Sequence, residues 1–246
     1  MRPLRLAEAY DAMASNLFPY EQIAAHLSAR LQHYRPPLWT ILDIACGTGN
    51  LTLPLAQLGY QVSGLDVSPE MLALAQEKGA AKGLKIPFLC HDMRQAYPHE
   101  PVEGITCFYG GLNFLTTSEA LRQALAAAYA ALLPGGLLAF DQFSESKMRA
   151  TFNGLKVADF GDFYVSTRSR CDAAGQIVHS VTYFLPEADG RYRREEELQR
   201  LRLHPLPEIQ RLLAETGFSL LAVESFYPQL PAEALQDTLL FIAQKP

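Results

Sequence analysis

Three aspartates each stand at the end of a run of residues that has the composition of a buried strand. They are Asp43, Asp66 and Asp92. Because the carboxyl ends of parallel strands meet at one edge of a sheet, we expect these side chains to line one crevice, at the point where the strand order reverses. Three carboxylates in one crevice suit a ligand that offers hydrogen-bond donors.

A loop that contains two glycines follows the first of these strands. Residues 42–50 read Leu-Asp-Ile-Ala-Cys-Gly-Thr-Gly-Asn. Gly47 and Gly49 allow a ligand to approach the backbone and allow a tight turn into a helix. A nicotinamide dinucleotide is an alternative ligand, but its fingerprint needs a third glycine where this chain has Thr52. Asp43 is also a poor neighbour for a pyrophosphate, so a dinucleotide-dependent oxidoreductase is a disfavoured alternative.

The elements that must position these residues alternate between short apolar runs and longer amphipathic stretches. This rhythm predicts βαβ units on a parallel sheet. Ser68-Pro69 and Ser118-Glu119 are helix-start signals, and Leu133-Pro134-Gly135-Gly136 is a helix stop. The predicted strands are 40–44, 61–66, 87–91, 104–108 and 136–141, and the predicted helices are 51–58, 69–82 and 118–132.

The segments on either side of this region follow other patterns. Helical spacing over 6–34 predicts one or two helices before the first strand. Alternation between 160 and 203 predicts a three-stranded antiparallel meander, and a helix over 207–216 and two strands come last. The mixed-charge run 193–197 is interpreted as a solvated strand edge or turn. The chain thus divides into an α/β body of residues 1–142 and 204–246 and an inserted antiparallel β segment of residues 143–203.

Composition and charge exclude several classes of function. The chain of 246 residues has 21 Lys and Arg against 26 Asp and Glu, a net charge of -5. This balance disfavours nucleic acid and anionic membranes as partners. No apolar stretch has the length of a signal peptide or of a membrane span. The four cysteines lack metal-ligand spacing, so we expect reduced thiols, a cytoplasmic location and no metal site.

Three ordered motifs resemble those of the class I S-adenosylmethionine-dependent methyltransferases. Residues 43–49 resemble the first motif of this family, although Ala45 stands where glycine is commoner. Residues 64–72 and 90–93 resemble its second-strand and third-strand motifs. The best match is to the small-molecule type with a β insertion after the fifth strand, in which an acid often stands at the position of Gly110.

The resemblance implies a fold, an activity and a set of site residues. The fold is a Rossmann-like, seven-stranded, mostly parallel sheet in the order 3-2-1-4-5-7-6, with the last strand antiparallel and helices on both faces. The activity is in-line transfer of a methyl group from S-adenosylmethionine to nitrogen or oxygen of a small-molecule acceptor, with S-adenosylhomocysteine as product. The implied cofactor-binding residues are Asp43, Ala45, Cys46, Gly47, Gly49, Asp66, Val67, Met71, Asp92, Met93 and Phe108.

Four residues are candidates for the acceptor side. They are Tyr10, Tyr20, Tyr109 and Asn113. As alternatives, the tyrosines at positions 10 and 20 are core aromatics, and Asn113 caps the segment after the fourth strand. A non-catalytic S-adenosylmethionine-binding protein is also left open. The sequence suggests a bacterial source through its Arg-rich composition, and either a monomer or a homodimer fits.

Overall fold

The computed structural model describes residues 4–226 and 237–246, which form two sheets with helices around them. The larger sheet has seven strands in the order β10-β11-β5-β4-β1-β2-β3, and β11 alone runs antiparallel to its neighbours. This confirms the predicted fold class, strand order and orientation. The strands are β1 (Thr40–Ile44), β2 (Gln61–Asp66), β3 (Phe88–Cys90), β4 (Val102–Cys107), β5 (Leu132–Phe143), β10 (Ser219–Ser225) and β11 (Thr238–Gln244).

Helices cover both faces of this sheet because successive residues of each central strand point to opposite sides. Leu42 of β1 packs in one core with α5 (Ser118–Ala131) and α7 (Leu206–Thr216), whereas Ile41 packs in another core with α2 (Tyr20–Tyr34) and α3 (Thr52–Gln57). Helix α4 (Pro69–Ala81) joins β2 to β3, and the Ser68 side chain caps it as predicted.

The second sheet has four antiparallel strands where three were predicted. The strand that sequence patterning missed is β6 (Gly154–Asp159), which is exposed along its whole length and so shows no alternation of buried and exposed residues. A short helix, α6 (Glu145–Thr151), precedes it. The other strands, in the order β6-β7-β8-β9, are β7 (Tyr164–Cys171), β8 (Gln176–Pro186) and β9 (Tyr192–Arg202).

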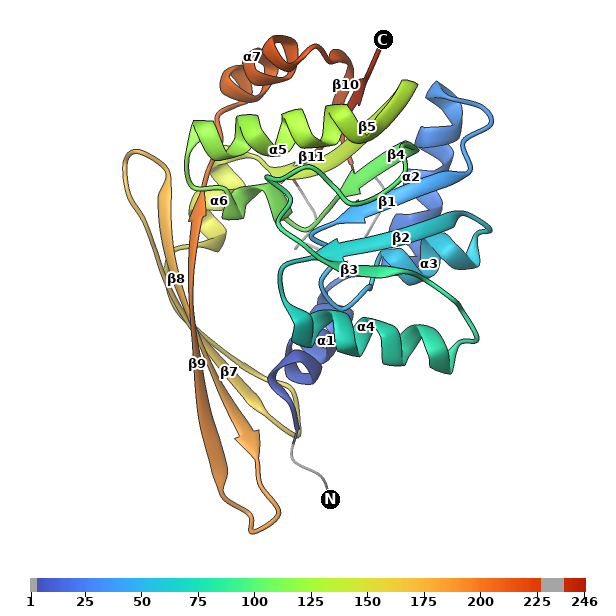
Figure 1. Ribbon diagram of the computed structural model, residues 1–246. Coiled ribbons are helices and arrows are strands. Elements are labelled where there is room, and N and C mark those ends of the chain that lie inside the picture. The colour runs from blue at the N-terminus through green and yellow to red at the C-terminus, as the bar shows by residue number, and fades with distance from the viewer. Residues whose placement is uncertain (1–3, 227–236) are drawn as a thin grey trace.

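The second sheet lies beside the carboxyl ends of the parallel strands, where Figure 1 shows it as a long twisted ribbon, and its contacts there include a shared core and a hydrogen bond. Helix α1 (Leu6–Leu17) buries Ala9 in a core with Val181 and Tyr183 on the inner face of this sheet. At the far end of β9, the Asn113 side-chain amide donates to the carbonyl oxygen of Arg202 at 2.8 Å. The inner face of β9 is thereby fixed over the edge of the main sheet at which Asp66 stands.

The predicted bounds of the helix over 118–132 agree with α5 to within one residue, but its N-cap and the structure of the segment that follows it differ from the predictions. The N-cap of α5 is Thr117, whose hydroxyl accepts the Ala120 N–H at 3.1 Å, and Ser118 is already helical. The predicted helix stop at 133–136 is part of β5. There the pairing of β5 with β4 shifts register between Val102 and Gly104, so the extra residues of the turn form an irregularity within the strand. Gly135 takes the left-handed φ of 74° that such an irregularity requires.

Candidate active site

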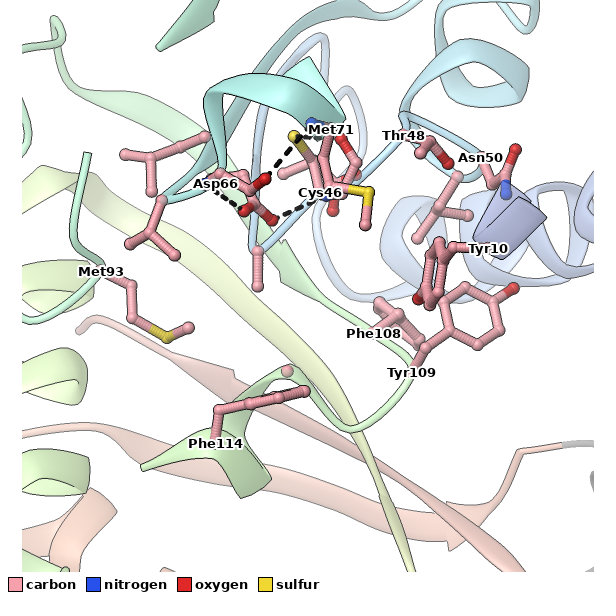
Figure 2. Close-up of a pocket in the computed structure, with 18 of the residues that line it drawn as sticks. Tyr10, Cys46, Thr48, Asn50, Asp66, Met71, Met93, Phe108, Tyr109 and Phe114 are labelled. Atoms are coloured by element: carbon pink, nitrogen blue, oxygen red, sulfur yellow. Dashed lines mark hydrogen bonds between the residues drawn. The ribbon is translucent and has the colours of Figure 1, made fainter. Parts of the chain in front are cut away.

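The glycine loop after β1 is tied to the end of β2 through Asp66. The backbone N–H of Gly47 donates to one carboxylate oxygen of Asp66 at 2.8 Å, and the N–H of Ser68 donates to the other at 2.9 Å. In Figure 2, dashed lines mark hydrogen bonds at the Asp66 carboxylate. Two backbone donors fix the orientation of the carboxylate, and the remaining lone pairs of its oxygens can accept from a ligand.

Asp43 lies below the loop rather than free in the pocket. Its side chain is buried, and its two oxygens accept from the hydroxyls of Thr52 at 2.6 Å and Thr106 at 2.7 Å. Burial raises the pKa of Asp43 to about 6, against the lowering effect of these two hydrogen bonds. These two bonds join β1, β4 and the start of α3 and fix the orientation of the carboxylate, which also lines the cavity.

A cavity of about 300 Å³ opens above the loop, at the lower end of the range of small-molecule sites. In Figure 2, Met93 lies on one side of Asp66, the aromatic residues Tyr10, Phe108 and Tyr109 lie on the other, and Phe114 lies below. The lining residues are Tyr10, Tyr20, Asp43, Ala45, Cys46, Gly47, Thr48, Asn50, Leu51, Leu65, Asp66, Val67, Ser68, Met71, His91, Met93, Phe108, Tyr109, Gly111, Phe114, Glu197 and Gln199.

Most of the sequence-predicted site residues meet in this cavity, and three do not. Gly49 lies behind the loop, buried against Leu53. Asn113 is buried and anchors β9, as described above. The Asp92 carboxylate is paired with the Arg94 guanidinium outside the lining. Its role toward adenine stays a prediction, and the cavity wall itself carries Asp43 and Asp66 of the three aspartates.

Sequence reasoning missed the residues that the second sheet contributes. Glu197 and Gln199 of β9 line the cavity, although the charged run that contains Glu197 was interpreted as a solvated edge. The signal was present in the alternation of that run: Glu195, Glu197 and Gln199 point inward, while Glu196 and Leu198 are exposed. The cavity lining also includes four residues that were not predicted, namely Thr48, Asn50, His91 and Phe114. Each of them is next to a predicted residue in the chain.

Aromatic rings form the wall opposite the loop. The Tyr20 ring lies edge-on to the Tyr109 ring, with centroids 4.8 Å apart. Burial raises the pKa of Tyr10 to about 12, with the charges of Asp66 and Glu197 as further causes, and burial also raises the pKa of Tyr20. Both phenols therefore stay protonated near neutral pH and can act as hydrogen-bond donors rather than as bases.

Helix α1, which carries Tyr10, is held across the cavity mouth by Asp11. One Asp11 oxygen accepts from both Thr48 and Lys78, each at 2.6 Å, and so ties α1 to the glycine loop and to α4. Replacing Asp11 by Ala should release α1 and raise the dissociation rate of a ligand bound in the cavity about tenfold in stopped-flow measurements. The control is Glu77→Ala, which breaks a more exposed α1–α4 ion pair with Arg5 and should change the rate less than twofold. Equal rates in the two variants would refute this role of Asp11.

Asp141 fixes the turn that presents Tyr109. This carboxyl at the end of β5 is buried and accepts the Gly110 N–H at 3.1 Å, and both Tyr109 and Gly110 have positive φ. An acid often stands at position 110 in the family, but its side chain would be strained at this φ of 72°.

Burial raises the pKa of Asp141 to about 7, which makes the stability of the fold depend on pH. A raised carboxyl pKa stabilises the fold at low pH, and this contribution is lost as the pH rises through 7. The Asp141→Asn variant does not titrate at this site. Its free energy of unfolding relative to the parent should rise by on the order of 2 kcal/mol between pH 5 and pH 8.5 in urea titrations. Parallel pH profiles of parent and variant would rule out the raised pKa.

Comparison with known proteins agrees with this geometry. Residues 41–136 match the family model described as a methyltransferase domain. A protein of Geobacillus sp. (strain WCH70) that carries a methyltransferase name is 31% identical over 241 residues, which are 96% of this chain and 96% of the relative. The chain belongs to the class I S-adenosylmethionine-dependent methyltransferases. The predicted family and enzyme class are thereby confirmed, and the oxidoreductase alternative has no support.

Two further methyltransferases resemble the chain over most of its length. The dTDP-3-amino-3,6-dideoxy-alpha-D-glucopyranose N,N-dimethyltransferase of Streptomyces fradiae is 26% identical over 218 residues, 87% of this chain and 84% of that enzyme. The solved structure of a methyltransferase from Clostridium acetobutylicum ATCC 824 has a TM-score of 0.85 and 22% identity, and covers 97% of this chain and 96% of its own. The structural likeness supports the fold, including the second sheet.

Two kinds of feature are absent from the part of the chain that the structure describes. Within residues 4–226 and 237–246, no helix is long and apolar enough to span a membrane. Over the same ranges, no group of three or more His, Cys, Asp and Glu side chains could hold a metal ion.

Proposed function

We propose that this methyltransferase binds S-adenosylmethionine in the cavity between Asp66 and β9 and transfers its methyl group to a small-molecule acceptor there. The observation that carries the proposal is the Asp66 carboxylate, held by two backbone N–H groups beside an open glycine loop. A carboxylate oriented in this way suits the two hydroxyls of a ribose.

The donor set of the cavity fits the rest of the cofactor. A Cβ added at Gly47 would have no atom within 4 Å, so the space beside this residue is open. The backbone of the loop can therefore approach the amino-acid end of the cofactor. Val67, Met71 and Met93 offer apolar and thioether surface for an adenine ring. Ala45, Cys46 and Phe108 also line the cavity. When bound, the cofactor supplies an electrophilic methyl group on a sulfonium.

The residues of the chain then act mainly by positioning and by excluding water. Helix α1 and β9 cover the acceptor side, and the protonated Tyr10 and Tyr20 donate hydrogen bonds that orient the acceptor. Holding two reactants in line converts a bimolecular step into an effectively unimolecular one, a gain of about 7–11 kcal/mol in favourable cases.

Several observations support a small acceptor and a cytoplasmic location. A cavity of about 300 Å³ has a size that suits small ligands. A net charge of -5 disfavours nucleic acid, and the four cysteines are free thiols, as suits a reducing compartment. The substrate named for the relative from Streptomyces fradiae is likewise a small molecule.

The proposal is tested by incubating the protein with methyl-labelled S-adenosylmethionine and a library of small metabolites, and by measuring S-adenosylhomocysteine release. Release that depends on a library member, with label in that compound, is the expected result. Tight cofactor binding without release across the library would favour a non-catalytic binding protein instead.

A further inference from the structure

We propose that Glu197 of β9 binds the amino group of the acceptor, and that the acceptor is therefore an amine. This inference rests on the proposed function and adds to it the class of substrate and the residue that selects it.

Within the part of the chain that the structure describes, Glu197 differs from the other carboxylates of the cavity in having no hydrogen-bond or ion-pair partner. The oxygens of Asp43 accept from two threonine hydroxyls, and those of Asp66 accept from two backbone N–H groups. Among the described residues, by contrast, no hydrogen bond or ion pair engages the Glu197 carboxylate. A half-buried carboxylate without a partner loses hydration and gains nothing in return unless a ligand supplies the donors.

Its neighbours along β9 show that the missing partner is particular to this position. Glu195 pairs with Arg193 at 2.8 Å, and Glu196 on the outer face pairs with Arg194. No Lys or Arg is present among the described residues that line the cavity. A ligand that carries a cationic group would therefore supply the charge that neutralises Glu197.

The surroundings of Glu197 suit an ammonium group. Tyr10, which lies close enough for the charge of Glu197 to raise its pKa, belongs to a wall of aromatic rings with Tyr20, Tyr109 and Phe114. Aromatic faces attract cations, and a carboxylate accepts hydrogen bonds from N–H donors. A phosphate or carboxylate next to the reacting group would meet repulsion in the same place.

Amine methylation gives Glu197 a chemical role as well as a binding role. The bound ammonium first releases one proton, through the Glu197 carboxylate to water, which frees the nitrogen lone pair. This lone pair forms the new N–C bond as the S–C bond breaks, and the electron pair of the S–C bond stays on sulfur. The positive charge thus moves to nitrogen, where Glu197 stabilises it.

The test uses matched probe pairs that differ in one atom type. The pairs are an amino sugar and its parent sugar, an arylalkylamine and its alcohol, and an alkyldiamine and its diol. Binding of each probe to the protein loaded with S-adenosylhomocysteine is measured by calorimetry, and methyl transfer from labelled S-adenosylmethionine is measured in parallel. In the parent protein, amines should bind and react, and their matched alcohols should be at least about tenfold worse.

The variants are Glu197→Gln, Glu197→Asp and the control Glu196→Gln. Glu197→Gln should weaken amine binding and lower kcat/KM by about 30-fold, with the affinity for S-adenosylhomocysteine changed less than about twofold. Glu197→Asp should restore part of the loss. Glu196→Gln, one residue away on the exposed outer face, should behave as the parent does.

Four results would overturn the assignment while leaving the proposed function in place. They are preferred methylation of alcohols or carbon acids, no reaction with any amine probe, parent-like behaviour of Glu197→Gln, and a tenfold loss of S-adenosylhomocysteine affinity in Glu197→Gln. The last would mean that Glu197 holds the amino group of the cofactor itself. If the parent protein does not bind S-adenosylmethionine at all, the proposed function fails first.

Discussion

The Asp66→Ala variant should bind S-adenosylmethionine at least about a hundredfold more weakly than the parent protein, as measured by calorimetry. The substitution removes the acceptor for the ribose hydroxyls, and it also leaves the N–H groups of Gly47 and Ser68 without the partners that hold the glycine loop to β2. The effect on binding should therefore exceed that of losing a single hydrogen bond.

The matched control for this substitution is Glu70→Ala. Glu70 is an exposed acid in the first turn of α4, outside the cavity lining, so its removal changes the same charge without changing the site. Its affinity should stay within about threefold of the parent. If the two variants bind the cofactor equally well, the ribose is not held by Asp66.

Replacing the two loop glycines by alanine should impair different properties. Gly49→Ala should lower the stability of the fold, and Gly47→Ala should lower the affinity for the cofactor. At Gly49, φ is 75° and a Cβ would lie 2.6 Å from Leu53 Cδ1 and 3.2 Å from Ala75 Cβ. Leu53 is buried and Ala75 cannot rotate away, so Gly49→Ala should lose about 3 kcal/mol of unfolding free energy. Unfolding in urea with the cofactor absent measures this loss.

At Gly47 the cost should fall on binding instead. Its φ of 54° strains an alanine by about 1 kcal/mol, but no atom lies within 4 Å of the added Cβ. Because Gly47 lines the cavity, that methyl group would occupy space where the ligand approaches the backbone. We expect a folded protein whose cofactor affinity is lower by at least about tenfold. Unchanged affinity in Gly47→Ala would show that the cofactor does not contact this loop.

The main sheet could be predicted from sequence because its signals are local. Strands such as β1 and β2 are short apolar runs that end in an acid or a glycine loop, and the motifs at Asp43 and Asp66 order them along the chain. The second sheet was predicted less well, because β6 has no buried face that would give it a pattern. Its Leu155 and Val157 are exposed despite being apolar.

The site residues that could be predicted are those for which a motif fixes both the residue type and its position at a strand end or loop. Gly47 and Asp66 lie where the motif implies, since a loop and a strand end of fixed length leave little freedom. Asp92 could not be placed from sequence, because Arg94, two residues later, competes for its carboxylate. Glu197 could not be recognised either, since the packing of α1 against the second sheet decides which face of β9 covers the cavity.

A crystal structure of the protein with S-adenosylhomocysteine tests the central claim most directly. The account predicts both ribose hydroxyls on the Asp66 carboxylate, the amino-acid end over the Gly47 loop, and the thioether sulfur turned toward the space beneath β9. A ligand bound elsewhere, or a ribose more than a hydrogen-bond length from Asp66, would contradict it.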